Sequence, residues 1–198
     1  MASRTVEHLF ADVSFALERG LGARDLVPML SRLVRCAPVG SDVSRFARLH
    51  LARQLVESEP FKAAALARSV VRETEDDEAY GLLGLALTVL GHYRAAAKAQ
   101  RRACHLHPSH PGHAHNLGHL LDVALDAPRR GLHWLERAFR AAPDVPEIAS
   151  SYAHALVRTG DTARAKSILR DHAELEPGEV ERTVNQWLSP PDAGKSIG

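Results

Sequence analysis

The sequence predicts an all-α protein, a right-handed solenoid of about five helix pairs closed by a single C-terminal helix. Three observations support this fold class. Small residues and prolines recur with nearly constant spacing, apolar residues recur at helical intervals, and glycine or proline separates successive apolar runs. The repeat length is 34 or 35 residues, which is typical of helix pairs that bury a continuous core between neighbours.

The clearest repeat spans residues 77–110. Its small residues fall where two helices would cross, and a larger side chain there would hold the helices apart. Gly91 separates the two apolar runs and can take the left-handed conformation that ends a helix. The small residues and the closing proline follow each other at intervals of twelve, seven and five, at Gly84, Ala96, Ala103 and Pro108.

The same intervals recur in three less regular copies. One copy has thirteen residues in place of twelve, and we expect the additional residue to lengthen the turn at Asp126-Ala127-Pro128. In another copy His172 takes the place of a small residue. The copies are built on Ala52, Ala64 and Val71; on Gly118, Gly131, Ala138 and Pro143; and on Ala153, Ala165, His172 and Pro177.

This pattern resembles the tetratricopeptide repeat, in which small, aromatic and proline residues recur about every 34 residues. The resemblance is strongest over residues 77–143 and extends through 146–177. It implies a stack of helix hairpins whose first helices line a concave groove. The residues that carry it are Tyr80, Leu83, Gly84, Leu87, Tyr93, Ala96, Ala103 and Pro108.

The N-terminal residues follow the pattern less closely. Apolar residues at helical spacing predict helices over 5–19 and 24–36, which we interpret as a degenerate pair that caps the stack. Helices over 42–57 and 61–73 form the next repeat. The acidic run from Glu73 to Glu78 then either complements the N-terminus of the following helix or forms a docking patch.

The remaining helix pairs are expected over 77–107, 112–141 and 146–175, with an amphipathic helix over 179–188 covering the end of the stack. The chain therefore divides into an N-terminal helix pair or cap (1–41), a degenerate repeat (42–76), three repeats (77–110, 111–145 and 146–178), a capping helix (179–189) and a flexible tail (190–198).

Composition narrows the functional classes. The net charge is +1, so we expect no nucleic-acid partner and no attraction to an anionic membrane. The apolar runs are too short to span a bilayer, and the N-terminal residues lack the pattern of a signal peptide. Two widely separated cysteines do not indicate a disulfide scaffold. These features favour a cytoplasmic protein.

The groove implied by the resemblance changes from apolar to polar along the chain, and it could hold a peptide segment or a helix. Asn116 resembles one asparagine of the clamp with which a subset of the family grips a peptide carboxylate. The neighbouring repeats lack the cations of that clamp, so we reject it. The expected partner-binding residues are Arg53, Leu85, Thr88, His115, Asn116, His119, Asp122, Ser150, His154 and Arg158.

Seven of the 12 histidines lie between His105 and His133. His115 and His119 are four residues apart, so both rings can approach one ion from a single helix face. His154 of the next first helix could supply a third ligand, and zinc or another divalent transition metal would suit such a set. The competing interpretation is that these histidines are polar groove residues that form hydrogen bonds with each other, water or a peptide.

No serine or cysteine stands in a recognisable nucleophilic setting, so we predict a non-catalytic protein without a cofactor. Its expected role is a scaffold or adaptor that binds a protein or peptide partner in the groove. The alternatives are the histidine metal site and self-association through the terminal caps, which would make the protein a homo-oligomer.

Overall fold

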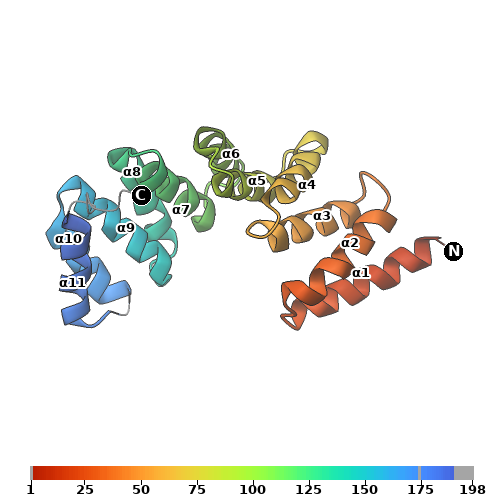
Figure 1. Cartoon of the computed structure of the whole chain (residues 1–198), viewed down its shortest axis with the longest axis horizontal. Helices are drawn as coiled ribbons and strands as arrows, with labels where there is room; N and C mark the ends of the chain where they lie inside the picture. The colour runs from red at the N-terminus through yellow and green to blue at the C-terminus, as the bar shows by residue number, and fades with distance from the viewer. Residues whose placement is uncertain (1, 174, 190–198) are drawn as a thin grey trace, which may run out of the picture. The chain divides into compact units, whose positions relative to one another are not determined.

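The computed structural model describes residues 2–173 and 175–189. Over these residues the chain forms α-helices and one π-helical segment, with no strand, so the prediction of an all-α solenoid is confirmed (Figure 1). The chain divides into two compact units, Met1–Pro108 and Ser109–Gly198, which we call the N-terminal and C-terminal units. None of the described helices is long and apolar enough to cross a membrane.

The N-terminal unit contains three helix pairs. Each helix packs against the next one along the chain, and α3 and α5, the first helices of successive pairs, also contact each other (Figure 1). This pairing of first helices is the arrangement that the repeat predicts. The helices are α1 (Ala2–Glu18), α2 (Ala23–Cys36), α3 (Asp42–Leu55), α4 (Pro60–Glu73), α5 (Asp77–Val89) and α6 (Tyr93–Leu106).

The C-terminal unit contains two helix pairs and a final single helix. Here too the first helices contact each other, α7 with α9 and α9 with α11. The unit consists of α7 (Pro111–His119), the π-helical segment η1 (Leu120–Ala124), α8 (Pro128–Ala141), α9 (Pro146–Thr159), α10 (Thr162–His172) and α11 (Pro177–Leu188).

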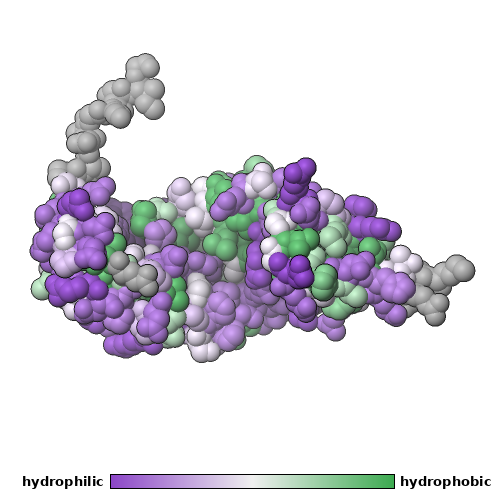
Figure 2. All heavy atoms as spheres, turned by 90° about the horizontal axis from the view of Figure 1, so that it is seen from below, coloured by the Kyte–Doolittle hydropathy of each residue, from purple (hydrophilic) through white to green (hydrophobic). Residues whose placement is uncertain are grey.

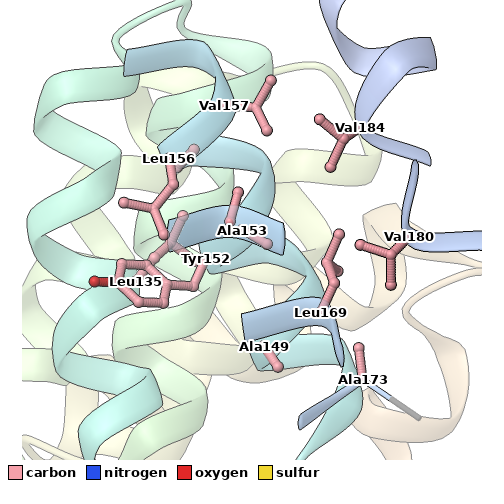
Figure 3. Packing of buried hydrophobic residues seen from close by; sticks show 12 residues of the cluster. Leu135, Ala149, Tyr152, Ala153, Leu156, Val157, Leu169, Ala173, Val180 and Val184 are labelled. Atoms are coloured by element: carbon pink, nitrogen blue, oxygen red, sulfur yellow. The ribbon is translucent and has the colours of Figure 1, made fainter. Parts of the chain in front are cut away.

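The core of the C-terminal unit is built around α9. Tyr152 of this helix is fully buried, beside Leu156 and the small residues of the crossing. In Figure 3, Val180 and Val184 of α11 face this core from the side of α10. Because α11 contributes these buried side chains and exposes mainly polar residues, it closes the apolar end of the unit.

The small residues lie at helix crossings, as the spacing predicted. A Cβ atom on Gly84 would lie 2.6 Å from the Gln100 side chain of α6, and one on Gly118 would lie 2.9 Å from the Leu135 backbone nitrogen of α8. Among these glycines Gly131 has the shortest distance to a backbone atom, because its Cβ would meet the Gly118 carbonyl oxygen at 2.7 Å. His172, the exception in the spacing, is half-buried and packs against a phenylalanine ring, Phe139.

The turns between helices also follow the sequence. Gly91 and Gly160 adopt left-handed conformations, with φ of 75° and 96°. The acidic run ends at a helix N-terminus, where Asp76 accepts a hydrogen bond from the Ala79 amide at 2.8 Å. Asp76 therefore caps α5, which supports the interpretation of this run as a complement to the helix N-terminus.

The additional residue of the repeat over 111–145 lies inside the helix and not in the turn. The expectation of a longer turn at Asp126-Ala127-Pro128 is therefore wrong. The turn between η1 and α8 comprises residues 125–127, and the turn of the preceding repeat, at 90–92, has the same length. The additional residue is taken up by η1, where the Leu125 amide donates to the Leu120 carbonyl five residues back at 3.0 Å. A π-helical turn holds more residues than an α-helical one, so it accommodates the insertion without breaking the helix.

Most of the surface is polar, with isolated hydrophobic side chains. Figure 2 shows one face on which hydrophilic residues surround smaller hydrophobic patches. The large exposed hydrophobic residues include Phe15, Val39 and Phe61. The tail expected at 190–198 lies outside the described residues.

Candidate interaction surface

Polar side chains of α7 and α9 meet on one side of the C-terminal unit. His115 Nε2 of α7 lies 3.0 Å from Ser151 Oγ of α9. His119 follows His115 by one turn, with ring centroids 6.0 Å apart, and is exposed. We call this surface the first-helix face, and it comprises His115, Asn116, His119, Ser150, Ser151, His154 and Arg158.

The first-helix face rests on a buried carboxylate. Asp122 of η1 is 1% exposed and accepts hydrogen bonds from two residues of α9. His154 Nδ1 lies 2.6 Å from its Oδ2, and Arg158 Nη1 lies 3.0 Å from its Oδ1. Arg158 also donates to the Asp122 backbone oxygen and to the Asp126 carboxylate. Asp122 was expected to face a partner, but its burial shows that it instead holds His154 and Arg158 in place.

The π-helical segment explains how Asp122 reaches this position. Asp122 lies within η1, and a Cβ atom on Gly131 would come within 2.9 Å of its backbone nitrogen. The absence of a side chain at Gly131 thus lets α8 lie directly against the wide turn that carries the carboxylate. Helical spacing of 3.6 residues per turn does not describe a π-turn, so it misplaced this side chain.

Helix α11 adds an aromatic contact to the same network. The Trp187 ring lies edge-on to His154, with centroids 5.1 Å apart and the planes at 88°. Trp187 also packs against the core around α9. His154 therefore contacts both the Asp122 carboxylate and the Trp187 indole ring.

The two α7 histidines are more readily uncharged than free histidine. Burial lowers the pKa of His115 below its ordinary value, and the neighbouring His119 lowers it further. Burial is also the main cause that lowers the pKa of His119, although the Asp122 carboxylate acts in the opposite direction. A neutral imidazole offers one hydrogen-bond donor and one acceptor, so at neutral pH these side chains present paired polar groups without net charge.

The predicted metal ligands do not gather into one ligand set within the described residues. No group of three histidine, cysteine or carboxylate side chains there is arranged to hold a metal ion. His154 directs Nδ1 to Asp122, and His115 directs Nε2 to Ser151. Both nitrogens are thus engaged within the protein, and metal binding by His115, His119 and His154 stays a prediction.

The other predicted contact residues belong to the N-terminal unit. Arg53 of α3 forms an ion pair with Glu78 of α5 at 2.6 Å. Leu85 is half-buried, and Thr88 donates a hydrogen bond to the Gly84 carbonyl at 2.9 Å. A cavity of about 180 Å³ lies between α3 and the start of α5, and its lining includes Glu78, the ion-pair partner of Arg53. The cavity is lined by Asp42, Arg45, Phe46, Leu49, His50, Asp76 and Glu78.

Solved structures share this architecture over nearly the whole chain. TTC0263, a thermophilic tetratricopeptide protein of Thermus thermophilus, is 16% identical over 92% of this chain and 98% of its own, with a TM-score of 0.70. The tetratricopeptide-repeat fold predicted from the sequence is thereby confirmed. MamA residues 41-end of Desulfovibrio magneticus are 15% identical over 90% of this chain and 96% of that chain, with a TM-score of 0.69. Pseudomonas aeruginosa PilF is 16% identical over 94% and 90%, with a TM-score of 0.70.

Neither a protein-family model nor a curated protein matches the sequence. At identities of 15–16% the structural likeness establishes the tetratricopeptide fold and leaves the partner to be argued from this chain's own residues.

Two contributors to the surface were not assigned by sequence reasoning. Asp126 contacts Arg158, and Trp187 contacts His154. Ser151, which contacts His115, was expected near the margin of the groove. Helical spacing could not assign Asp126, because it lies in the turn after η1 with a positive φ. The contact of Trp187 depends on the path of the chain after α10 in the tetratricopeptide fold, which no local pattern specifies.

Proposed function

We propose that the protein is a non-catalytic interaction module that binds a peptide segment or a helix of a partner protein over the first-helix face. The observation that carries this proposal is the Asp122 network. A buried carboxylate fixes the histidine and the arginine of α9 from beneath, so these side chains lose little conformational freedom when a partner binds. Polar groups held in fixed positions on one face are a general means of recognising a polypeptide.

The chemistry of this face favours hydrogen bonding to uncharged groups. The lowered pKa values of His115 and His119 favour neutral rings near pH 7, and Asn116 lies between them on α7 as a further donor and acceptor. The Arg158 charge is compensated by Asp122 and Asp126. We therefore expect the preferred segments to be polar and weakly charged.

Selection from a displayed peptide library against the full chain tests the proposal. We expect selected peptides to lose about tenfold or more in affinity when Asn116, His119 and Ser150 are all replaced by alanine, because each lost hydrogen bond contributes about 0.5–1.5 kcal/mol. Asp122 is left intact, because its burial makes its replacement a test of stability.

The matched control replaces three exposed side chains of the second helix α8, Arg129, Arg130 and His133, with alanine. This variant should keep the affinity of the unmodified chain. Peptides that bind both variants equally well would exclude the first-helix face as their site. Circular dichroism of both variants verifies that each one retains its helices.

The metal alternative has support from one distance, the 6.0 Å between the His115 and His119 rings. It requires about one zinc or other divalent transition-metal ion per chain, lost on His119→Ala. We expect much less than one ion per chain in protein purified without an affinity tag, because no three histidine, cysteine or carboxylate side chains of the described residues are arranged to hold a metal ion. Elemental analysis of the unmodified chain and His119→Ala decides between the two, and stoichiometric metal that is lost in the variant would favour the alternative.

A further inference from the structure

A hydrophobic recess lies at the other end of the chain, on the first helix pair of the N-terminal unit. It has a volume of about 520 Å³ and lies beside the end of α1 and the start of α2. Phe15 is 62% exposed and Leu21 is 38% exposed, so this end of the unit presents uncovered apolar surface. The recess is lined by Asp12, Phe15, Ala16, Arg19, Leu21 and Met29.

The charged residues of the recess are placed symmetrically about its apolar centre. Asp12 lies on α1, and Arg19 directly follows its last residue, Glu18. The Arg19 amide still donates to the Phe15 carbonyl four residues back, so the spacing of seven residues, about 10 Å, sets both charges on the same side. Phe15 and Ala16 occupy the midpoint between them. When this helix is read in the opposite direction, the acid and the base exchange places while the apolar centre stays where it is.

We propose that the recess binds a second copy of this chain, with the two α1 helices antiparallel about a two-fold axis near Phe15 and Ala16. In this arrangement Asp12 of each copy faces Arg19 of the other, and Phe15 of each copy enters the recess of the other. A two-fold interface must be complementary to itself, and the order acid, apolar, base along one helix satisfies this condition. The proposal concerns helices other than those of the first-helix face and does not depend on the function proposed above.

The contacts within one chain leave these charges available for pairing. Neither Asp12 nor Arg19 forms an ion pair with any residue that the structure describes. The Arg19 guanidinium instead lies 5.7 Å from the centre of its own Phe15 ring. Arg19 therefore stands beside the apolar centre, from which it can reach a carboxylate of the opposing helix.

Charge reversal tests the antiparallel pairing. Asp12→Arg alone or Arg19→Asp alone places like charges opposite each other twice in a symmetric dimer, so each variant should raise the dimer dissociation constant about tenfold or more. The double variant Asp12→Arg/Arg19→Asp restores both opposite pairs and should dimerise like the unmodified chain. A mixture of the two single variants should also dimerise, since every charged contact in the mixed dimer is again attractive.

Sedimentation equilibrium over a range of concentrations measures all of these states, and circular dichroism verifies that each variant is folded. Phe15→Glu, which places a charge at the apolar centre, should abolish dimerisation in every background. The proposal is overturned if the unmodified chain stays monomeric at all concentrations. It is overturned equally by a dimer whose dissociation constant does not respond to the reversals, because another surface or the C-terminal residues would then form the contact.

Discussion

Asp122 is the residue on which the candidate surface depends most. A carboxylate that is 1% exposed must have partners, and here His154 and Arg158 provide them. Both partners lie on α9, one turn apart, so the carboxylate ties η1 to the next first helix. The same interaction that stabilises the C-terminal unit thus orients the side chains that we propose to contact a partner.

Replacement of Asp122 by asparagine should separate this role from that of an ordinary surface charge. Asp122→Asn keeps the shape of the side chain but removes its charge and replaces one of its two acceptor oxygens with an NH2 donor. Arg158 and His154 are then left to share a single, weaker acceptor. We expect the free energy of unfolding to fall by about 2 kcal/mol, as for the loss of hydrogen bonds between charged groups.

Asp126→Asn is the matched control. The Asp126 side chain is 85% exposed and also pairs with Arg158, and asparagine tolerates its left-handed conformation. This variant should lose less than about 0.5 kcal/mol. Urea denaturation measures the free energy of unfolding of both variants. Equal losses would mean that the burial of Asp122 does not increase its contribution to stability.

At the scale of the helices, the sequence predicted those features that depend on local steric contacts, namely the helix crossings and the glycine turns. Gly84, Gly118 and Gly131 could be assigned to helix crossings because only a small residue allows two backbones to approach, and Gly91 because its turn requires a positive φ. The π-helical segment could not be predicted, since counting residues does not distinguish a wider helical turn from a longer loop. The orientation of Asp122 was lost for the same reason.

The crossing of α8 with η1 should tolerate no added methyl group. Gly131→Ala would place Cβ 2.7 Å from the Gly118 oxygen and 2.9 Å from the Asp122 nitrogen, and backbone atoms cannot move aside locally. We expect this substitution to cost about 1–3 kcal/mol, in spite of the better helix propensity of alanine.

Gly84→Ala provides the comparison, because its close contacts are all with side-chain atoms of the buried Gln100 and none is with backbone. Gln100 can change rotamer, although it would give up its hydrogen bond to the Gly81 carbonyl. We expect the loss at Gly84 to be clearly smaller than at Gly131 in thermal or urea unfolding. A larger loss at Gly84 would contradict the argument that a close contact with backbone costs more than one with a side chain.

At the scale of the whole chain, the repeat makes the fold predictable and the partner unpredictable. The period fixes which helices pair, because each hairpin must bury its apolar face against the next. It constrains neither the polar residues of the first helices nor the recess at the end of α1, which Asp12, Phe15 and Arg19 line. Those positions are free to vary within the fold, so function must be argued from their contacts.

The histidines of α7 should give the chain a measurable pH dependence of stability. Burial lowers the pKa values of His115 and His119 in the folded state below the ordinary value of 6.5, so the unfolded chain binds more protons as the pH falls. The free energy of unfolding should therefore be fully maintained above pH 6.5 and should decrease as the pH is lowered below it. Carboxylates such as Glu73, whose pKa is lowered mainly by its hydrogen bonds with Arg48, contribute only near and below 4.5.

Urea denaturation between pH 7.5 and 5 tests this expectation on the unmodified chain and on His115→Gln/His119→Gln. The double variant has no imidazole to protonate at these positions, so its stability should decrease less steeply between pH 6.5 and 5. At pH 7.5 the histidines are uncharged in both states, and a comparison there isolates the effect of the lost contact between His115 and Ser151. Stability that rises as the pH falls, or an unchanged slope in the variant, would show that these rings are not held neutral by the fold.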